Sequence, residues 1–486
     1  MTVGHTSTAL AERPDALLDE DDLRSLLDTC RYAVRRAATT DTPVLATWAV
    51  PVEVDDPAAL WARGRGTATR SLLWRSAWGG GTVVALGSAH DLPGTGADRV
   101  AAVRRGWAAL SRHAVAGGLP GGGPLALGGF AFAAGAPAAP GPLPDALFWV
   151  PALQLRTAAD GTGELRLNAV LGRDGDAGRT ADALARLADL VHPRDLGAVP
   201  AAPAPRPAAH LRSSTELPGA EEWKGLVRRA TDRISAGDFA KVVLARELHV
   251  TVDAPFDVPA VVERMRRANP GTTLFAVDHD GQTFLGATPE YLARVEGRTV
   301  HALGLAGTTP RGATPAQDAE FERELTGSHK LRHEHDVVVR MLRDSLHGAG
   351  VEVAAAQPTR VLKLGTVQHL STDVSGRLSH TDPAGILDFV ERLHPTPALG
   401  GHPRERALHW LAEHEGFDRG WYAGVVGWSD AGGQGEFAVA IRSALLRGNT
   451  AVLYAGCGLV ADSDPETEYV ETRAKLRAMM SALEVE

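Results

Sequence analysis

The sequence contains only two cysteines, Cys30 and Cys457, and this scarcity excludes a disulfide framework and a metal cage built from thiolates. It also lacks an excess of positive charge. Its 50 lysines and arginines against 59 aspartates and glutamates give a formal net charge of −9, which argues against nucleic acid or an anionic membrane as a partner. The first twenty residues show neither the basic nor the apolar region of a secretory signal, so we expect a cytoplasmic protein. The remaining composition, 44% hydrophobic and 22% charged over 486 residues, is typical of a globular chain with a large core.

Lysine is scarce as well, because the 50 basic residues include only Lys224, Lys241, Lys330, Lys363 and Lys475. Arginine therefore serves wherever a generic positive charge suffices. A buried lysine, unlike an arginine, can lose its proton near neutral pH. Each of these lysines is thus a candidate for chemistry that arginine cannot perform.

The chain alternates between helical and strand-forming stretches, with one break near its middle. Residues 1–190 mix short apolar strands with helical segments such as 99–115. Residues 191–210, rich in proline and alanine, predict a surface connection that is either a domain boundary or a long loop. Beyond it we expect helices over 219–236, 258–269, 315–346 and 465–483, and strands over 241–250, 272–278, 282–286, 292–296, 361–370, 421–428, 436–446 and 451–460. Strands that follow one another without a helix favour antiparallel sheets.

Two residues have the chemistry of a base and an acid. Lys241 begins the apolar segment KVVLARELHV, where burial would lower the pKa of its amine, although a lysine at the rim of the strand would reach solvent and stay charged. Glu290 lies in the turn GATPEYL, as a proton donor or merely as the cap of a helix. A second glycine turn, HALGLAGTTPRG, offers the backbone around Gly307 and the hydroxyl of Thr308 to an anionic oxygen.

Carboxylates on two predicted helices indicate a cation site. Glu334 falls on an apolar helix face and needs a cation there, but zinc is disfavoured because Val337 stands where the helical zinc motif requires a second histidine. Glu468, Glu471 and Lys475 share one face of the last helix, which by itself is also typical of a salt-bridged surface. Glu334 and Glu471 together would form an oxygen-rich site suited to Mg²⁺.

Further residues indicate a ligand that carries a carboxylate. Arg442, inside the apolar segment EFAVAIRSALL, predicts a buried guanidinium with a bidentate anionic partner. Gly456 and Gly458, in LYAGCGLV, would let a ligand approach the backbone of a strand. The residues alone therefore indicate an enzyme with one base and one acid, and leave its reaction open.

Eight segments, in this order, resemble the chorismate-utilising enzymes, and most closely their isochorismate synthases: KVVLAR, GATPEYL, LAGTTPRG, RHEH, HLST, LHPTPALGG, GEFAVAIRSALL and LYAGCGLVADSDPETEYVETRAKL. The resemblance implies an α/β (α+β) fold, one large domain over residues 1–486 in which two packed antiparallel sheets are surrounded by helices. In this interpretation 1–190 is an N-terminal part, 191–210 a loop and 215–484 the chorismate-binding catalytic region.

The resemblance also implies a role for each candidate residue. Lys241 matches the water-activating base and Glu290 the general acid in a conversion of chorismate to isochorismate. Mg²⁺ would be held by Glu334 and Glu471, with Glu468 in its outer shell. The implied substrate-binding residues are Gly307, Thr308, His369, Ala398, Tyr422, Arg442, Gly456, Gly458 and Lys475.

Single positions separate the sub-families. Relatives that install ammonia usually have glutamine in place of Lys241, and salicylate synthases, which go on to eliminate pyruvate, typically have threonine in place of Ala398. The amino-acid sequences of the last two segments resemble the menaquinone-pathway members more than the siderophore-pathway members, which favours menaquinone biosynthesis. Salicylate synthesis, siderophore-pathway isochorismate synthesis and non-catalytic chorismate binding are the alternatives. The chain departs from the family at Leu331, where many members have an acidic residue, and at Gln368, where they have tryptophan. Family preference suggests a monomer.

Overall fold

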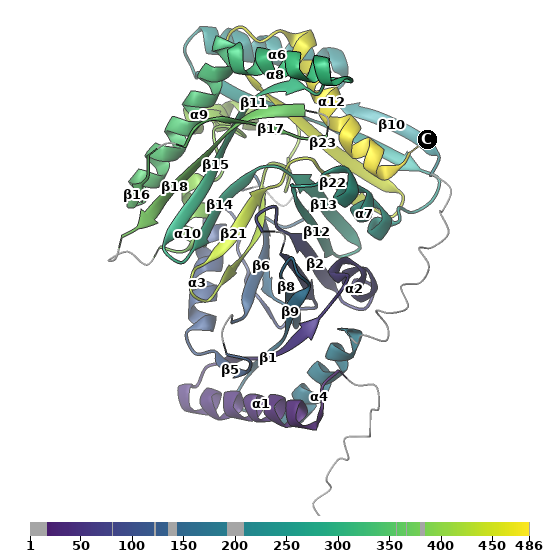
Figure 1. The fold of residues 1–486 in the computed structure, drawn as a ribbon, viewed down its shortest axis with the longest axis vertical. Coiled ribbons are helices and arrows are strands. Elements are labelled where there is room, and N and C mark those ends of the chain that lie inside the picture. The colour runs from purple at the N-terminus through teal and green to yellow at the C-terminus, as the bar shows by residue number, and fades with distance from the viewer. Residues whose placement is uncertain are drawn as a thin grey trace, which may run out of the picture.

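The computed structural model describes residues 17–79, 81–120, 123–134, 143–191, 209–355, 357–365, 367–379 and 384–485. Most of the predicted connection, residues 192–208, lies outside these ranges. The described chain forms two β-sheets with helices around them (Figure 1). This arrangement confirms the predicted fold class.

Within the described residues the larger sheet has 13 strands, all paired antiparallel except β1 with β5. In spatial order they are β10 (Leu211–Leu217), β11 (Lys241–Val252), β23 (Thr450–Leu459), β22 (Ser443–Arg447), β13 (Gln282–Thr288), β12 (Thr273–His279), β2 (Arg70–Arg75), β3 (Thr82–Leu86), β8 (Leu153–Thr157), β9 (Thr162–Leu171), β1 (Val44–Glu53) and β5 (Val115–Gly118), with β19 (Gly401–His402) paired to β11. Strands from before and after the predicted connection thus share one sheet.

The smaller sheet, with 10 strands in the described residues, is antiparallel throughout. In spatial order it contains β16 (Val351–Val353), β18 (Val367–Leu378), β15 (Thr299–Pro310), β14 (Tyr291–Glu296), β21 (Gly435–Val439), β20 (Val425–Asp430), β6 (Leu125–Phe130), β7 (Ala146–Val150) and β4 (His90–Asp91), with β17 (Arg360–Lys363) paired to β18.

The helices cover the outer faces of the sheets. They are α1 (Glu20–Thr40), α2 (Pro57–Gly64), α3 (Arg99–Ser111), α4 (Ala177–Ala188), α6 (Ala220–Ser235), α7 (Val258–Ala268), α8 (Pro315–Gly327), α9 (His329–Gly348), α10 (Ile386–Leu393), α11 (Arg404–His414) and α12 (Pro465–Leu483). Helices α6 and α12 contact β23, α8 and α9 contact β15 and β18, and α1 and α4 contact β9 at the other end of the molecule (Figure 1). None of the helices in the described ranges is long and apolar enough to cross a membrane.

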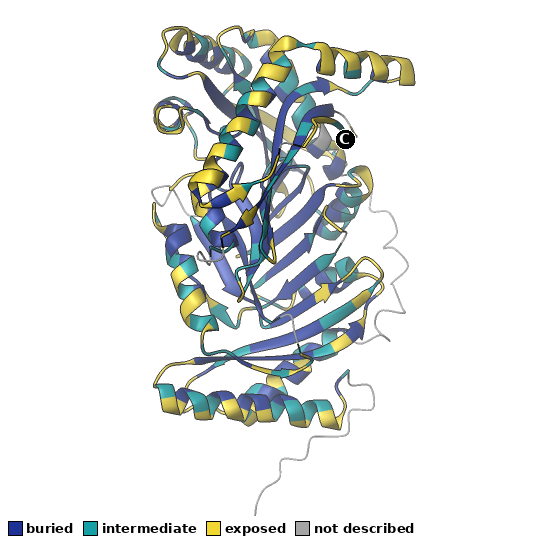
Figure 2. Ribbon diagram, turned by 60° about the vertical axis from the view of Figure 1, so that its left-hand side comes forward, coloured by how far each residue is buried: buried dark blue, intermediate teal, exposed yellow. Residues whose placement is uncertain are grey.

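The core follows the alternation of side chains along the strands. On β2, Leu72 and Trp74 join a cluster that also contains Phe130 and Phe437 of the smaller sheet, whereas Leu73 joins a second cluster under α1, α4 and α7. Buried residues accordingly line the strands, and exposed residues gather on the outer faces of the helices (Figure 2). The first cluster lies between the two sheets and fixes their relative position.

Several predicted element boundaries were wrong. The helix expected over 315–346 ends at Gly327 and restarts at His329, because Ser328 adopts an extended conformation and caps the second helix through the N–H of Leu331. The strand expected over 436–446 is two strands in different sheets, β21 and β22. The strand expected over 361–370 is also two strands, β17 and β18, but these pair with each other in the smaller sheet. The strand expected over 421–428 begins only at Val425. The turn expected around Gly307 is part of a strand that we did not predict, β15.

Candidate active site

The chain crosses from one sheet to the other twice at the same place, and a predicted site residue lies at each crossing. Glu290 connects β13 to β14, and Arg442 connects β21 to β22. The carbonyl of Glu290 accepts a hydrogen bond from Val439 N at 3.0 Å, and the carbonyl of Arg442 accepts one from Ala287 N at 3.2 Å. The two crossings therefore lie side by side.

Arg442 was expected inside a strand, and this prediction was wrong. The residue has φ 53°, in the left-handed region that side chains adopt at a cost, and lies where the chain leaves β21 in one sheet and enters β22 in the other. Its guanidinium makes no hydrogen bond or ion pair to another described residue, although the charges of Tyr422 and Glu471 act on it. The anionic partner predicted for it is thus not supplied by this part of the protein, and a ligand carboxylate can take that place.

Glu290 is buried, with 6% of its surface exposed. Burial raises the pKa of its carboxyl from an ordinary value of 4.5 to about 8, and the ammonium groups of Lys241 and Lys475 only partly oppose this shift. Glu290 therefore carries its proton at neutral pH. Two lysines lie close enough for their charges to act on it.

Lys241 is the first residue of β11, and its side chain is 9% exposed. Its Nζ donates a hydrogen bond to Oε1 of Glu334, on α9, at 2.6 Å. The residue is buried as expected, and its amine forms an ion pair with this carboxylate. A role as a base would require that the amine be released from Glu334.

Helix α12 brings two more carboxylates and a second lysine to the same strands. Glu471 Oε1 and Lys475 Nζ are 2.6 Å apart, and Lys475 Nζ also donates to the carbonyl of Gly456 at 2.7 Å. Although burial opposes ionisation, the ammonium of Lys475 holds the pKa of Glu471 below its ordinary value. Glu468 is hydrogen bonded to Ser463 and Cys457, and burial together with the charge of Glu471 raises its pKa.

The glycines of β23 make room for these side chains. A Cβ on Gly458 would lie 2.7 Å from Lys241 Cε and 3.4 Å from Glu334 Oε1. A Cβ on Gly456 would lie 3.1 Å from the hydroxyl oxygen of Tyr422. Both contacts are tighter than a Cβ normally tolerates or close to that limit, so these glycines leave room for the side chains of Lys241 and Tyr422. The approach of a ligand to this backbone stays a prediction.

On the smaller sheet, Thr308 and His369 face each other across β15 and β18, with Thr308 Oγ1 and His369 Nδ1 2.9 Å apart. Burial, together with the charges of Arg442 and Lys475, lowers the pKa of His369 to about 3, so its ring is neutral. Gly307 forms a bulge with φ 74°, where a Cβ would lie 3.1 Å from the carbonyl of Leu331. This glycine lets α9 approach β15 closely.

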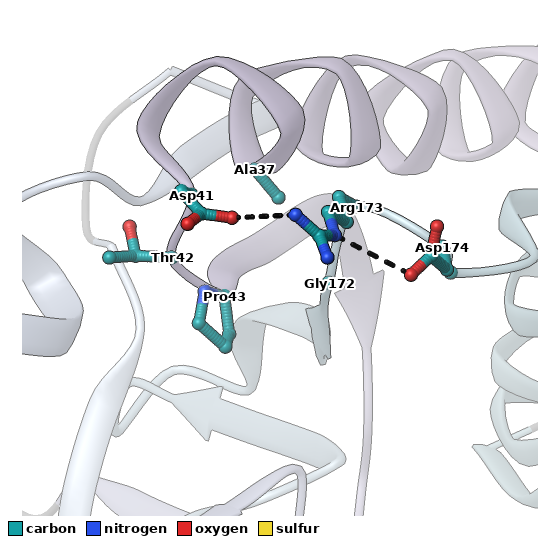
Figure 3. Close-up of a pocket in the computed structure, with 8 residues that line it drawn as sticks. Ala37, Asp41, Thr42, Pro43, Gly172, Arg173 and Asp174 are labelled. Carbon is teal, nitrogen blue, oxygen red and sulfur yellow. Dashed lines mark hydrogen bonds and ion pairs between the residues drawn. The ribbon is translucent and has the colours of Figure 1, made fainter.

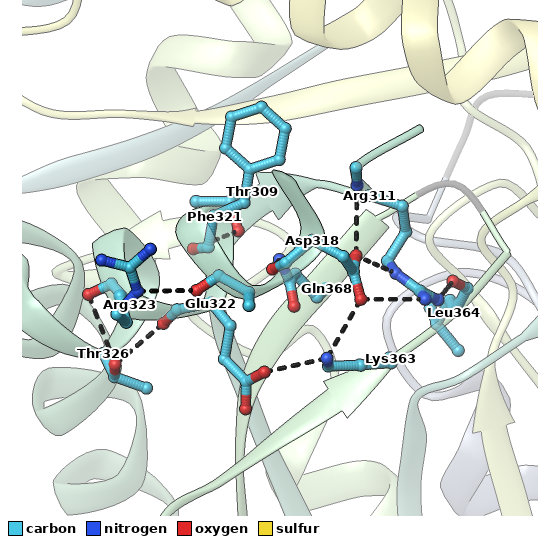
Figure 4. Close-up of polar contacts among 12 residues, drawn as sticks. Thr309, Arg311, Asp318, Phe321, Glu322, Arg323, Thr326, Lys363, Leu364 and Gln368 are labelled. Atoms are coloured by element: carbon cyan, nitrogen blue, oxygen red, sulfur yellow. Dashed lines mark hydrogen bonds and ion pairs between the residues drawn. The ribbon is translucent and has the colours of Figure 1, made fainter. Parts of the chain in front are cut away.

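A polar network next to this pair fastens α8 to the sheet (Figure 4). Asp318 accepts hydrogen bonds from Arg311 Nε at 2.6 Å and Lys363 Nζ at 3.0 Å, and Gln368 Nε2 donates to the carbonyl of Pro310 at 3.3 Å. Arg311 holds the pKa of Asp318 well below its ordinary value. Lys363, one of the five lysines, therefore has a structural partner, and Gln368 occupies a fully buried position before His369.

Ala398 lies in the segment 394–400 between α10 and β19. The carbonyl of Gly400 accepts a hydrogen bond from Val243 N at 3.1 Å, two residues beyond Lys241. The backbone thus places Ala398 on the Lys241 side of the site.

A separate hollow of about 290 Å³ lies at the opposite edge of the larger sheet, where Arg173 pairs with Asp41 and Asp174 (Figure 3). None of the predicted site residues lines it.

Whether a divalent cation fits can be judged from the carboxylates. Within the described residues, no group of three or more histidine, cysteine, aspartate or glutamate side chains is arranged to hold a metal ion. Lysines bind Glu334 and Glu471, whereas Glu468, 9% exposed, forms no ion pair with a described residue. Carboxylate oxygens are the ligands that Mg²⁺ prefers, and a buried carboxylate without a cation is costly. The donors are thus of the type that Mg²⁺ prefers, but Lys241 and Lys475 occupy two of the three carboxylates, and the predicted Mg²⁺ site stays a prediction.

The fold, with a buried acid, a buried lysine and an arginine gathered where the two sheets meet, is that of an enzyme. Comparison with known proteins agrees: the family described as "Chorismate binding enzyme" matches residues 32–484. The chain belongs to this family.

Three known proteins that resemble this chain are described as isochorismate synthases. The chain is 35% identical over 481 residues to a salicylate biosynthesis isochorismate synthase of Pseudomonas aeruginosa, which covers 95% of this chain and 94% of that protein. It is 43% identical over 263 residues to the isochorismate synthase MenF of Bacillus subtilis, covering 54% of this chain and 55% of that protein. The solved structure of MenF, the menaquinone-specific isochorismate synthase from Escherichia coli, superposes with a TM-score of 0.74 at 25% identity and covers 94% of this chain and 100% of that one.

The sequence did not single out one buried pair in this region, Glu415 and Arg419. A glutamate and an arginine four residues apart predict an exposed helical pair. Helix α11 ends at His414, however, and both side chains are buried. Gly416, inside this stretch, and Gly420, directly after it, were the signal that a helix could not continue.

Proposed function

We propose that the protein is an isochorismate synthase, which converts chorismate to isochorismate. The observation that carries this proposal is that Glu290, whose pKa burial raises to about 8, lies close enough to the amine of Lys241 for the charge of Lys241 to act on it. A proton donor and a potential proton acceptor on either side of one ligand are what the exchange of a hydroxyl between two ring carbons needs.

In the proposed reaction the neutral amine of Lys241 takes a proton from water as the water oxygen bonds to C2. The ring double bonds shift, the bond between C4 and its hydroxyl breaks, and Glu290 gives its proton to the departing hydroxyl, which leaves as water. The pKa of Glu290, about 8, suits a donor at neutral pH. Lys241 must lose its proton before each turnover, so the Glu334 carboxylate cannot stay 2.6 Å from it throughout.

Other residues would bind the anionic groups of the substrate. The guanidinium of Arg442 lies at the crossing between the sheets, and the ammonium of Lys475 lies at the carbonyl of Gly456. Both groups are cations that attract carboxylates. The backbone of Gly456 and Gly458 offers close approach. We assign Tyr422, Ala398, Gly307, Thr308 and His369 to the rest of the pocket wall.

We infer that Mg²⁺ is the cofactor, held by Glu334 and Glu471 with Glu468 beside them. When bound, it would supply positive charge for a carboxylate of the substrate. The chain's own residues still supply the base, the acid and the groups that orient the ligand.

The particular pathway and setting are also proposals. The likeness to MenF proteins supports menaquinone biosynthesis, and the likeness to the Pseudomonas aeruginosa protein supports an isochorismate synthase of salicylate or siderophore biosynthesis as the second candidate. We propose that the enzyme is monomeric and cytoplasmic. We also propose that it forms one domain, since both sheets contain strands from before and after residues 192–208.

The test is to incubate the purified protein with chorismate and Mg²⁺ and to separate the products by chromatography. We expect isochorismate in equilibrium with chorismate. Salicylate and pyruvate as main products would replace the proposal with a salicylate synthase. Unchanged chorismate at saturating Mg²⁺ would make the protein a binding protein.

A further inference from the structure

Strand β11 has a gap along one edge, just beyond Lys241. Its partner β19 pairs only with Lys241 and Val242, and its partner β10 begins to pair at Glu247. The backbone groups between them therefore need other partners, because unpaired buried N–H and C=O groups are costly.

A buried ion pair fills this gap. Arg419 and Glu415 have side chains only 2% and 5% exposed, and they bind through two hydrogen bonds, Nε to Oε2 and Nη2 to Oε1, both 2.6 Å. Glu415 Oε1 also accepts from Ala245 N at 2.7 Å, and Arg419 Nη2 donates to the carbonyl of Val243 at 2.6 Å. The pair thus takes the place of a neighbouring strand.

The same guanidinium reaches a third segment. Arg419 Nη1 donates to the carbonyl of Leu399 at 3.0 Å, next to Ala398. The carbonyl of Arg419 accepts from Tyr422 N at 2.9 Å. One side chain and its backbone are therefore bonded to the strand that begins at Lys241, to the segment that carries Ala398 and to the turn that carries Tyr422.

We propose that Arg419, buttressed by Glu415, is a positioning residue that sets where the Lys241 amine stands relative to Ala398 and Tyr422. This inference rests on the proposed function. The Arg419–Glu415 pair, here called the junction, forms no hydrogen bond or ion pair with Glu334, Glu471, Arg442 or Lys475 within the described part of the chain; these residues lie on α9, on α12 and at the crossing between the sheets. Its loss should therefore disturb the reacting amine more than the binding of substrate.

Arg419→Lys tests the proposal, because lysine keeps the charge but cannot form the fork to Glu415 and reach two carbonyls as well. We expect kcat to fall about 100-fold, the scale of a 1 Å misplacement of a reacting group. KM for chorismate should stay within about threefold, because Arg442 and Lys475, the cations proposed to hold the substrate, are not bonded to this pair among the described residues. A purely structural role would instead change kcat and KM together with the melting temperature.

Arg166→Lys is the matched control. Arg166 is as deeply buried, binds Glu164 at 2.6 Å, and lies on β9, away from β11 in the sheet. Its replacement should lower the melting temperature and leave kcat unchanged. Glu415→Gln is the milder variant at the junction, since its amide oxygen still accepts from Ala245 N, and it should show a smaller loss of kcat with KM again unchanged.

A wild-type kcat in Arg419→Lys or in Glu415→Gln would overturn the inference. So would an equal loss of kcat in the control Arg166→Lys, measured at the same loss of melting temperature. Both results leave isochorismate production by the wild-type protein intact. Failure of the wild-type protein to convert chorismate would instead overturn the proposed function on which the inference rests.

Discussion

Lys241 Nζ lies 2.6 Å from Glu334 Oε1, so the residue proposed as base and a residue proposed as metal ligand are bound to each other. The two roles compete for this contact, because a carboxylate beside an amine favours the charged, non-basic form of the amine. A cation that takes Glu334 removes that effect. The base and the metal site are therefore coupled through one carboxylate.

Replacing Lys241 by methionine should increase the affinity for Mg²⁺ about tenfold in the absence of substrate, since no ammonium then competes for Glu334. Titration calorimetry measures this directly. Lys363→Met is the control, because Lys363 pairs with Asp318 and Glu322, outside the site, and the affinity should not change. Weaker binding to the Lys241 variant would contradict the competition.

Lys241→Arg should keep the ion pair with Glu334 but abolish the base, because arginine does not lose its proton. We expect turnover to fall at least about 1000-fold, within the range that general base catalysis contributes. The rate of isochorismate formation at saturating chorismate checks this. A rate within tenfold of the wild-type rate would refute the role of Lys241.

Glu471→Gln should weaken Mg²⁺ binding at least about tenfold, because the amide carries no negative charge for the cation. Glu466→Gln, on the same helix but paired with Lys224 at the surface, should bind Mg²⁺ as the wild-type protein does. Equal affinities for the two variants in calorimetry would remove Glu471 from the proposed metal site.

Ala398→Thr should divert part of the product toward pyruvate elimination, since salicylate synthases typically have threonine at this position. Coupling pyruvate to lactate dehydrogenase measures the diverted fraction. We expect pyruvate from the variant and none above background from the wild-type protein. Pyruvate from neither would show that Ala398 does not decide where the reaction stops.

The sequence predicts the fold class and the strands that carry Lys241, Gly456 and Gly458, because long apolar runs and glycine signals are local. It fails at Arg442, where an unbroken apolar run passes from one sheet to the other and only the tertiary structure interrupts it. Periodicity cannot reveal such a crossing, since both strands on either side are buried.

The ion pairs of the site were equally out of reach. Lys241 and Glu334 are 93 residues apart, so no spacing rule connects them. The scarcity of lysine did single out Lys241 and Lys475, yet it applied equally to Lys363, whose partners Asp318 and Glu322 belong to a supporting network. Composition can thus select candidates, and only the fold separates reacting residues from supporting ones.

The raised pKa of Glu290 makes a prediction about stability as well as rate. Below pH 4.5 the carboxyl is protonated in folded and unfolded protein alike, and its contribution to stability is fully present. Between pH 4.5 and about 8 only the unfolded chain ionises it, so the free energy of unfolding falls as pH rises, by up to about 1.4 kcal/mol per pH unit. Above about pH 8 the loss is complete.

Glu290→Gln removes this dependence, because the amide stays neutral at every pH. The variant should therefore melt at a higher temperature than the wild-type protein at pH 8, and the difference should shrink toward pH 4.5. Its turnover should fall about 1000-fold, and wild-type kcat should decline above about pH 8, where Glu290 loses the proton that it donates. Calorimetric melting at several pH values measures the effect on stability, and the pH profile of kcat measures the effect on rate. A difference in melting temperature between the variant and the wild-type protein that does not depend on pH would mean that Glu290 ionises normally in the folded protein.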